Sequence, residues 1–183
     1  MPRQRVNLSE VTLTALAIVD RESLDALTLS AVAAELGIRP SALYTYFANV
    51  DALRYAVAVQ ATMQLTEDLR DAAIGQAGDD AILALAATYR SFANRHPGWY
   101  AATLAPPRAQ ADDLAQASST LTEVFARVIV SYGHEGDQAI HAARAARSAI
   151  HGFVALEAGD CLGPTDRDAS FEHLIATIIN GLT

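Results

Sequence analysis

A single glycine separates two short helical patterns near the N-terminus, and this spacing limits the possible fold more than any other feature of the chain. Apolar residues before the glycine recur on one helix face, at Leu29, Val32, Ala33 and Leu36. Thr28 is suited to cap this helix, and Gly37 to end it because glycine readily adopts a left-handed backbone. Pro40 fits the first turn of a second helix. The pattern predicts two short helices joined by a tight turn.

Small and apolar residues across this turn are placed for two helices that cross at a steep angle. Such a crossing needs a small residue at the contact, a glycine in the turn and an apolar anchor in the second helix. Ala33, Gly37 and Leu43 meet these needs, and Ile38 is the apolar residue after the glycine. Residues 29–47 are therefore predicted to form a helix-turn-helix, although a helical hairpin without a DNA role has the same spacing.

The second helix is expected to bury Leu43, Tyr44 and Phe47 and to present a polar outer side. Its outward residues are Arg39, Pro40, Ser41, Ala42 and Thr45. This is the part of a recognition helix that meets base edges in the major groove. Arg39 can bind a guanine edge or a phosphate, and Thr45 a base or a thymine methyl group.

The rest of the chain has an all-helical composition, rich in alanine and leucine, with proline and glycine between long periodic stretches. Helices are predicted at residues 8–24, 50–73, 81–94, 99–104, 109–132, 137–158 and 167–181. Asn49 can cap the helix that starts at Val50. The fold is expected to be all-α, with an N-terminal three-helix helix-turn-helix domain for DNA binding and a C-terminal helical bundle.

Charge is distributed unevenly along the chain. The net charge is −8, but residues 1–54 carry five arginines against six carboxylates, so this end is almost neutral. Non-specific affinity for DNA should therefore be modest. Arg3 and Arg5 lie in a polar N-terminal arm that could enter a minor groove, or form a disordered tail. The single cysteine, Cys161, excludes an internal disulfide and fits a reducing cytoplasm; no leader or membrane span is expected.

The sequence Leu43-Tyr44-Thr45-Tyr46-Phe47, followed by Leu53, resembles the end of the recognition helix in the TetR family of bacterial transcription regulators. Thr28 and the turn residues Ala33, Gly37 and Ile38 match the same family. The resemblance implies phosphate contacts by Tyr44 and Tyr46, while Tyr44 can instead belong to the core. Ser30, at the start of the first helix of the motif, is a further candidate for a phosphate.

Two residues depart from the family pattern. Val50 stands where the family usually has a lysine that supports a phosphate contact, and Arg39 replaces the usual small polar cap. Losing one lysine contact should weaken binding and flatten its salt dependence by about one phosphate.

The C-terminal half is similar to the ligand-binding and dimerisation half of TetR regulators. The stretches Arg95–Tyr100 and His151–Glu157 resemble motifs of a subgroup often called the WHG type. The resemblance implies a DNA-binding domain at residues 1–54 and a ligand-binding and dimerisation domain at residues 55–183.

Aromatic and polar residues around the break near Pro97 suggest a pocket for a small, mostly apolar ligand. The candidates are Met63, Tyr89, Phe92, His96, Trp99, Tyr100, Thr103, Phe125 and His151. Each of them can also be an ordinary core residue. No histidine pair has the spacing of a metal-binding helix, so no metal site is expected, and no cofactor is expected.

The alanine-rich helix 137–158 and the apolar helix 167–181 are candidates for a homodimer interface across a two-fold axis. The alternative is an internal bundle core. A dimer would present two recognition helices about one DNA turn apart, ~34–36 Å.

Together these features predict a cytoplasmic repressor that a small molecule releases from a palindromic operator, with the helix from Val50 as the lever between the domains. The alternative is a protein of the same fold that acts through a protein partner. No nucleophile elbow, phosphate loop or paired-carboxylate pattern suggests an enzyme.

Overall fold

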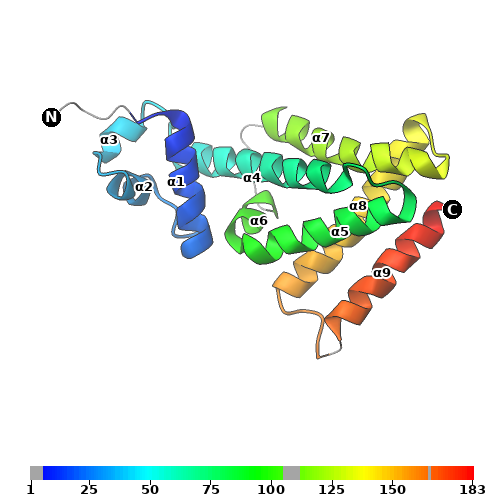
Figure 1. Cartoon of the computed structure of the whole chain (residues 1–183). Helices are drawn as coiled ribbons and strands as arrows, with labels where there is room; N and C mark the ends of the chain where they lie inside the picture. The colour runs from blue at the N-terminus through cyan, green and yellow to red at the C-terminus, as the bar shows by residue number, and fades with distance from the viewer. Residues whose placement is uncertain (1–5, 105–111, 165) are drawn as a thin grey trace. The chain divides into compact units, whose positions relative to one another are not determined.

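A computed structural model describes residues 6–104, 112–164 and 166–183, and within these ranges the chain contains helices and no strand (Figure 1). The helices are α1 (Leu8–Arg21), α2 (Leu29–Glu35), α3 (Pro40–Leu43), α4 (Val50–Ala73), α5 (Gly78–Arg95), α6 (Pro97–Leu104), α7 (Asp112–Ile129), the 3₁₀ turn η1 (Val130–Tyr132), α8 (Gly136–Ala158) and α9 (Arg167–Leu182). The all-α prediction is confirmed. None of the helices in the described ranges is long and apolar enough to cross a membrane.

The chain divides into two compact units. The first consists of Met1–Thr62 and His96–Ala115, and the second of Met63–Arg95 and Gln116–Thr183. Helix α4 begins in the first unit and ends in the second, and so does α7. Helix α6 belongs to the first unit although α5, directly before it, belongs to the second.

The first unit is built around α1. The Asn7 side chain accepts a hydrogen bond from Glu10 N at 2.8 Å, and the Glu10 carboxylate accepts one from Asn7 N at 3.1 Å. This capping box fixes the start of α1 at Leu8, because it satisfies amide groups that have no partner within the helix. The core around α1 is fully buried and includes Val11, Ala15, Leu16, Leu27, Val32, Ala33, Leu43, Leu53 and Val57.

Several helix ends differ from the predicted ones, and two of these differences have a clear physical cause. The second helix of the motif was expected to continue to Phe47, but α3 ends at Leu43. The Thr45 hydroxyl donates to Ala42 O at 2.7 Å and so competes for a helical carbonyl. Helix α6 was expected to begin at Trp99, but it begins at Pro97, because proline suits the first helical position.

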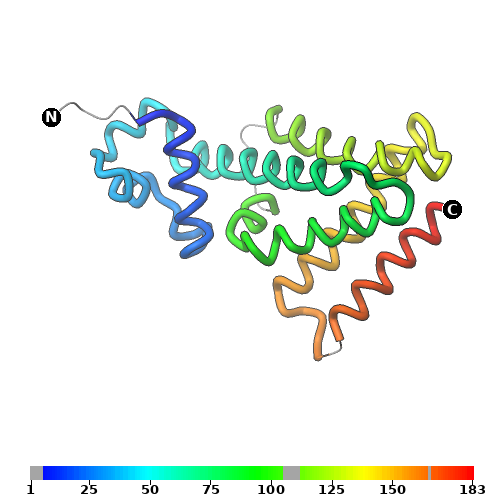
Figure 2. Tube along the Cα trace, viewed as in Figure 1, coloured from blue at the N-terminus to red at the C-terminus, as the bar shows by residue number. Residues whose placement is uncertain are grey.

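The second unit contains α5, α8 and α9, which pack against one another (Figure 2). Arg90 of α5 binds Glu157 of α8 through Nε and Oε2 at 2.8 Å, and its Nη1 lies 2.7 Å from Asp168 Oδ1 of α9. The guanidinium carbon also lies 4.8 Å from the centre of the Phe171 ring. This one arginine of α5 therefore ties α5 to both α8 and α9, although Glu157 of α8 lies 67 positions further along the chain.

Candidate nucleic-acid interface

The helix-turn-helix is formed by α2, a turn at Gly37 and α3. Thr28 caps α2 by accepting a hydrogen bond from Ala31 N at 3.0 Å. Gly37 has a φ of +65°, which a residue with a side chain rarely adopts, and Ile38 N closes the turn on Ala33 O at 3.0 Å. The small contact residue Ala33 is fully buried, as the spacing predicted.

All the candidate DNA-binding side chains are exposed at this motif. They are Thr28, Ser30, Arg39, Pro40, Ser41, Ala42, Tyr44, Thr45 and Tyr46. The expectation that Tyr44 is buried is wrong, since its side chain is 60% exposed. The short length of α3 explains this, because only Leu43 and Phe47 turn inward, at 0% and 5% exposure.

The two exposed tyrosines differ in what their hydroxyl groups do. The Tyr46 hydroxyl donates a hydrogen bond to the backbone carbonyl of Val6. A phosphate contact that uses this proton therefore requires Tyr46 to leave Val6. Tyr44 is 60% exposed, and the structure gives its hydroxyl no hydrogen-bond partner among the described residues.

The surface of the motif carries little positive charge. Arg39 is the only basic residue between Thr28 and Phe47, and the same stretch contains Glu35. Glu35 forms an ion pair with Arg21 of α1 at 3.2 Å, in which both side chains are about half exposed. Arg39 is exposed at the N-terminal boundary of α3. Arg3 and Arg5 lie outside the described residues.

Asn49 and Val50 mark the start of α4. The Asn49 side chain accepts a hydrogen bond from Ala52 N at 2.9 Å, as expected for the cap of that helix. Val50, in place of the usual lysine, is partly buried. Its side chain can donate no hydrogen bond to a phosphate near this helix end, unlike the lysine that the family usually has there.

Asp20 of α1 anchors the N-terminus of α6. Its Oδ1 accepts hydrogen bonds from Gly98 N at 3.0 Å and Trp99 N at 3.4 Å, and its Oδ2 lies 2.7 Å from His96 Nδ1. The Trp99 indole donates to Leu16 O at 3.1 Å, and the His96 and Trp99 rings stack 4.5 Å apart. A carboxylate is favourable at this place because the first amides of a helix lack internal partners and carry partial positive charge.

Gly98 lies in direct contact with the backbone of α1. A Cβ atom at this position would lie 2.2 Å from Val19 O and 2.4 Å from Val19 C. Real atoms do not approach this closely, so the spacing between α1 and α6 requires glycine. Nothing in the sequence pattern predicted this contact, and the assignment of His96 and Trp99 to a ligand pocket stays a prediction. The sequence His-Pro-Gly-Trp indicates that a new helix begins at the proline, and the first amides of such a helix need a capping partner.

The candidate pocket residues fall into both units. His96, Trp99, Tyr100 and Thr103 belong to the first, and Met63, Tyr89, Phe92, Phe125 and His151 to the second. Tyr100, Phe92 and Phe125 are almost completely buried, whereas Met63 is 46% exposed. The Thr103 hydroxyl donates to Tyr100 O at 2.7 Å.

Tyr89 and His151 form a polar side-chain pair among these candidates. The Tyr89 hydroxyl and His151 Nδ1 are 2.8 Å apart. Burial raises the pKa of Tyr89 and lowers the pKa of His151, and the nearby Arg147 guanidinium lowers both. Near neutral pH the pair is therefore uncharged, which suits a largely apolar site. In the described part of the chain, no three His, Cys, Asp or Glu side chains are grouped to hold a metal ion.

Comparison with known proteins agrees with this geometry. Residues 12–57 match the sequence family described as "Bacterial regulatory proteins, tetR family", and residues 82–178 match "Tetracyclin repressor-like, C-terminal domain". An uncharacterised HTH-type transcriptional regulator of Mycobacterium tuberculosis, Rv0681, is 36% identical over 92% of this chain and 78% of its own length.

Two solved structures are similar in fold. A protein of unknown function from Rhodococcus sp. RHA1 superposes with a TM-score of 0.82 at 23% identity, covering 99% of this chain and 98% of that one. The Q116A variant of TetR from Acinetobacter baumannii AYE, in complex with minocycline, has a TM-score of 0.72 at 22% identity; the match covers 97% of this chain and 96% of that one.

Proposed function

Because this chain belongs to the TetR family of bacterial transcriptional regulators, we propose that it is a repressor that leaves a palindromic operator when a small molecule binds. The family and its named relatives are DNA-binding regulators and not enzymes. The observation that carries the proposal is the exposure of every candidate DNA contact on α2, α3 and the residues after α3. As a regulator of bacterial genes, it would act in the cytoplasm.

In this proposal, Arg39 reads a guanine edge or holds a phosphate, and Ser41, Ala42 and Thr45 lie against base edges. Tyr44 and Ser30 bind phosphates, and Tyr46 joins them when its hydroxyl exchanges Val6 O for a phosphate oxygen. With valine in place of the usual lysine at position 50, binding has one ionic contact fewer, and its salt dependence is flatter by about one phosphate.

The proposed homodimer uses α8 and α9. Within one chain, Ala139, Ala143 and Ala146 are buried, so these three alanines belong to the internal core. Ala145 is exposed, and Ala142 and Ala149 are only partly buried. On α9, Leu174 and Ile178 are also only partly buried, which supports a second copy covering them. Light scattering on the wild type and on Ala145→Arg tests this: the wild type should have twice the mass of the variant.

The proposed ligand occupies the core of residues 55–183, where Tyr89 and His151 supply paired polar groups among buried aromatics. The minocycline complex of TetR from Acinetobacter baumannii supports a small-molecule ligand for this fold. Its effect reaches the DNA-binding unit through α4 and through the junction of α5 and α6. Only His96 lies between α5 and α6, and Asp20 holds the start of α6 to α1. A ligand shifts the equilibrium only by its different affinities for the two states.

The direct test is binding of the purified protein to a fluorescent duplex of its own upstream region, followed by anisotropy at increasing salt. Arg39→Ala should raise the Kd roughly 5- to 100-fold, the cost of one bidentate base contact. Tyr46→Phe should raise it about fivefold, the cost of one hydrogen bond. Arg70→Ala, which removes an exposed arginine of α4 in the second unit, is the matched control and should leave the Kd unchanged.

The second candidate function, action through a protein partner, is favoured by the nearly neutral N-terminal end and by Val50. Salt dependence separates the two, since DNA binding weakens steeply with salt. No rise in the anisotropy of the upstream duplex at about 50 mM salt would favour action through a protein partner.

A further inference from the structure

A broad groove crosses the surface of α4 within the first unit. Its volume is about 610 Å³, which lies within the range of about 300–1,000 Å³ that is common for small-molecule sites. Helix α1 forms one wall, the residues after α3 close one end, and the start of α7 contributes Asp113. All of these residues belong to the same unit. We refer to this site as the α4 groove.

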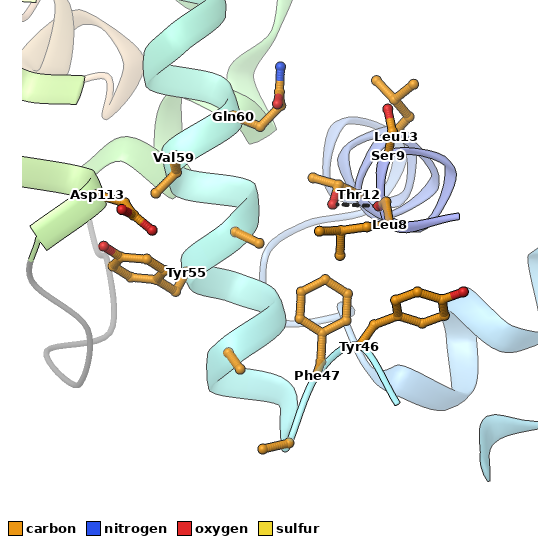
Figure 3. Close-up of a pocket in the computed structure, with 13 residues that line it drawn as sticks. Leu8, Ser9, Thr12, Leu13, Tyr46, Phe47, Tyr55, Val59, Gln60 and Asp113 are labelled. Carbon is orange, nitrogen blue, oxygen red and sulfur yellow. Dashed lines mark hydrogen bonds between the residues drawn. The ribbon is translucent and has the colours of Figure 1, made fainter. Parts of the chain in front are cut away.

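The α4 groove has an apolar end next to α1. Leu8 and Leu13 of α1 line it with 52% and 53% of their surface exposed, which is unusual for leucine in a helix that otherwise buries its apolar side chains. Phe47 lies beside Leu8 and Thr12 in Figure 3. Ala52 and Ala56 form part of the floor, and their short side chains leave the space open.

The opposite end of the α4 groove is polar and acidic. Figure 3 shows Asp113 and Tyr55 together on one side of α4, with Leu8, Thr12 and Phe47 on the other side. The Tyr55 hydroxyl oxygen accepts a hydrogen bond from Leu114 N at 2.9 Å, and its second lone pair can accept another from an ammonium group. Among the described residues, Asp113 is the only charged one that lines the groove, and no ion pair between such residues involves it.

We propose that the α4 groove binds a small molecule with an apolar body and a protonated amine at one end. The amine lies at Asp113 with the Tyr55 hydroxyl beside it, and the apolar body crosses Ala52 and Ala56 toward Leu8 and Phe47. Among the described residues that line the groove, no basic side chain is present to pair with a carboxylate or a phosphate. Burial of the exposed leucine surface supplies the driving force, and the carboxylate selects the sign of the charge.

A ligand in this groove would contact α1, α4 and the residues after α3 at once, because Tyr46 also lines the groove. It would then fix the helix-turn-helix against α4 and change the affinity for the operator. This consequence rests on the proposed function. Binding in the groove does not, so the two are tested separately.

The experiment titrates the full-length ¹⁵N-labelled protein with decylamine, and in parallel with decanoate, below the concentrations at which either forms micelles. Amide shifts in α1 and in the first half of α4 report occupation of the groove, and no DNA is present. Decylamine should produce saturable shifts there, and decanoate should bind more weakly.

Asp113→Asn is expected to raise the Kd for decylamine about two- to fivefold, the range for one exposed ion pair. Asp112→Asn is the matched control, since it removes the same charge one residue away, from a side chain that does not line the groove, and should leave the Kd unchanged. Val59→Trp fills the groove and should abolish the shifts in α1 and α4.

Equal Kd values for decylamine and decanoate, or for the Asp113→Asn and Asp112→Asn variants, would overturn the proposal. So would shifts centred on the second unit. If circular dichroism shows that Val59→Trp has lost its helices, the comparison of the two aspartate variants decides alone.

Discussion

Replacing Gly98 with alanine tests whether the contact between α1 and α6 holds the DNA-binding unit together. The added Cβ atom would meet Val19 O at 2.2 Å, Val19 C at 2.4 Å and Asp20 N at 2.7 Å. All three are backbone atoms, so no side-chain rotation can relieve the overlap. To reach an ordinary separation of about 3.5 Å, α6 would have to move roughly 1 Å away from α1.

The expected cost follows from comparing two responses of the molecule. If α6 moves, the bonds from Gly98 N and Trp99 N to Asp20, now 3.0 and 3.4 Å long, are lost or weakened, at about 1.5–3 kcal/mol for each bond to a charged group. If α6 stays, the strain of overpacking costs about 1–3 kcal/mol. The cheaper response determines the outcome, so we expect the free energy of unfolding to fall by about 1–3 kcal/mol.

Urea unfolding followed by circular dichroism measures this loss, and fluorescence tells the two responses apart. Trp99 is the only tryptophan of the chain, and its indole donates to Leu16 O. A shift of its emission to longer wavelength would mean that α6 has moved. Gly181→Ala, in α9, is the control, because a Cβ atom there meets nothing within 4 Å. A Gly98→Ala variant as stable as Gly181→Ala would show that the contact between α6 and α1 does not require glycine.

Three further predictions concern stability. Thr28→Ala removes the cap that accepts from Ala31 N and should cost about 1 kcal/mol in urea unfolding, while Thr28→Ser should retain most of the stability. Arg90→Met leaves the largely buried Glu157 without its partner and should lower the free energy of unfolding by about 3 kcal/mol. If the double variant Arg90→Met, Glu157→Gln loses less, the unpaired charge of Glu157 causes the loss. Burial lowers the pKa of His151 below its unfolded value of about 6.5, so the unfolded state binds more protons and stability falls as the pH drops through that value. The stability difference between wild type and His151→Gln should therefore shrink from pH 7.5 to pH 5.5, and a constant difference would contradict the assigned shift.

The parts of the fold that were predictable from sequence depend on short-range chemistry. Thr28 and Asn49 each cap a helix within three residues of themselves, and Gly37 takes the left-handed conformation that its turn requires. In each case the residue and its partner lie in the same short stretch, so spacing was sufficient.

The parts that were not predictable depend on contacts between distant segments. Asp20 and Gly98 are 78 positions apart, and no periodicity in either segment indicates that they meet. Tyr44 was misplaced for a different reason: its position in the apolar pattern fits a longer helix, but α3 ends one residue before it. The candidate pocket stays a prediction, because burial alone does not separate a ligand site from a core.

Helix α6 also affects how the protein can be made and rearranged. The DNA-binding unit is discontinuous in the chain, since it contains His96–Ala115 as well as Met1–Thr62. During synthesis, α1 leaves the ribosome about 80 residues before α6 is complete, which at about 5–20 residues per second is roughly 4 to 16 seconds. Over that interval the face of α1 around Val19 remains uncovered. A hybrid regulator made by joining residues 1–54 to another bundle would keep the helix-turn-helix but lose α6, so the bundle that receives it would have to supply a matching His-Pro-Gly-Trp segment.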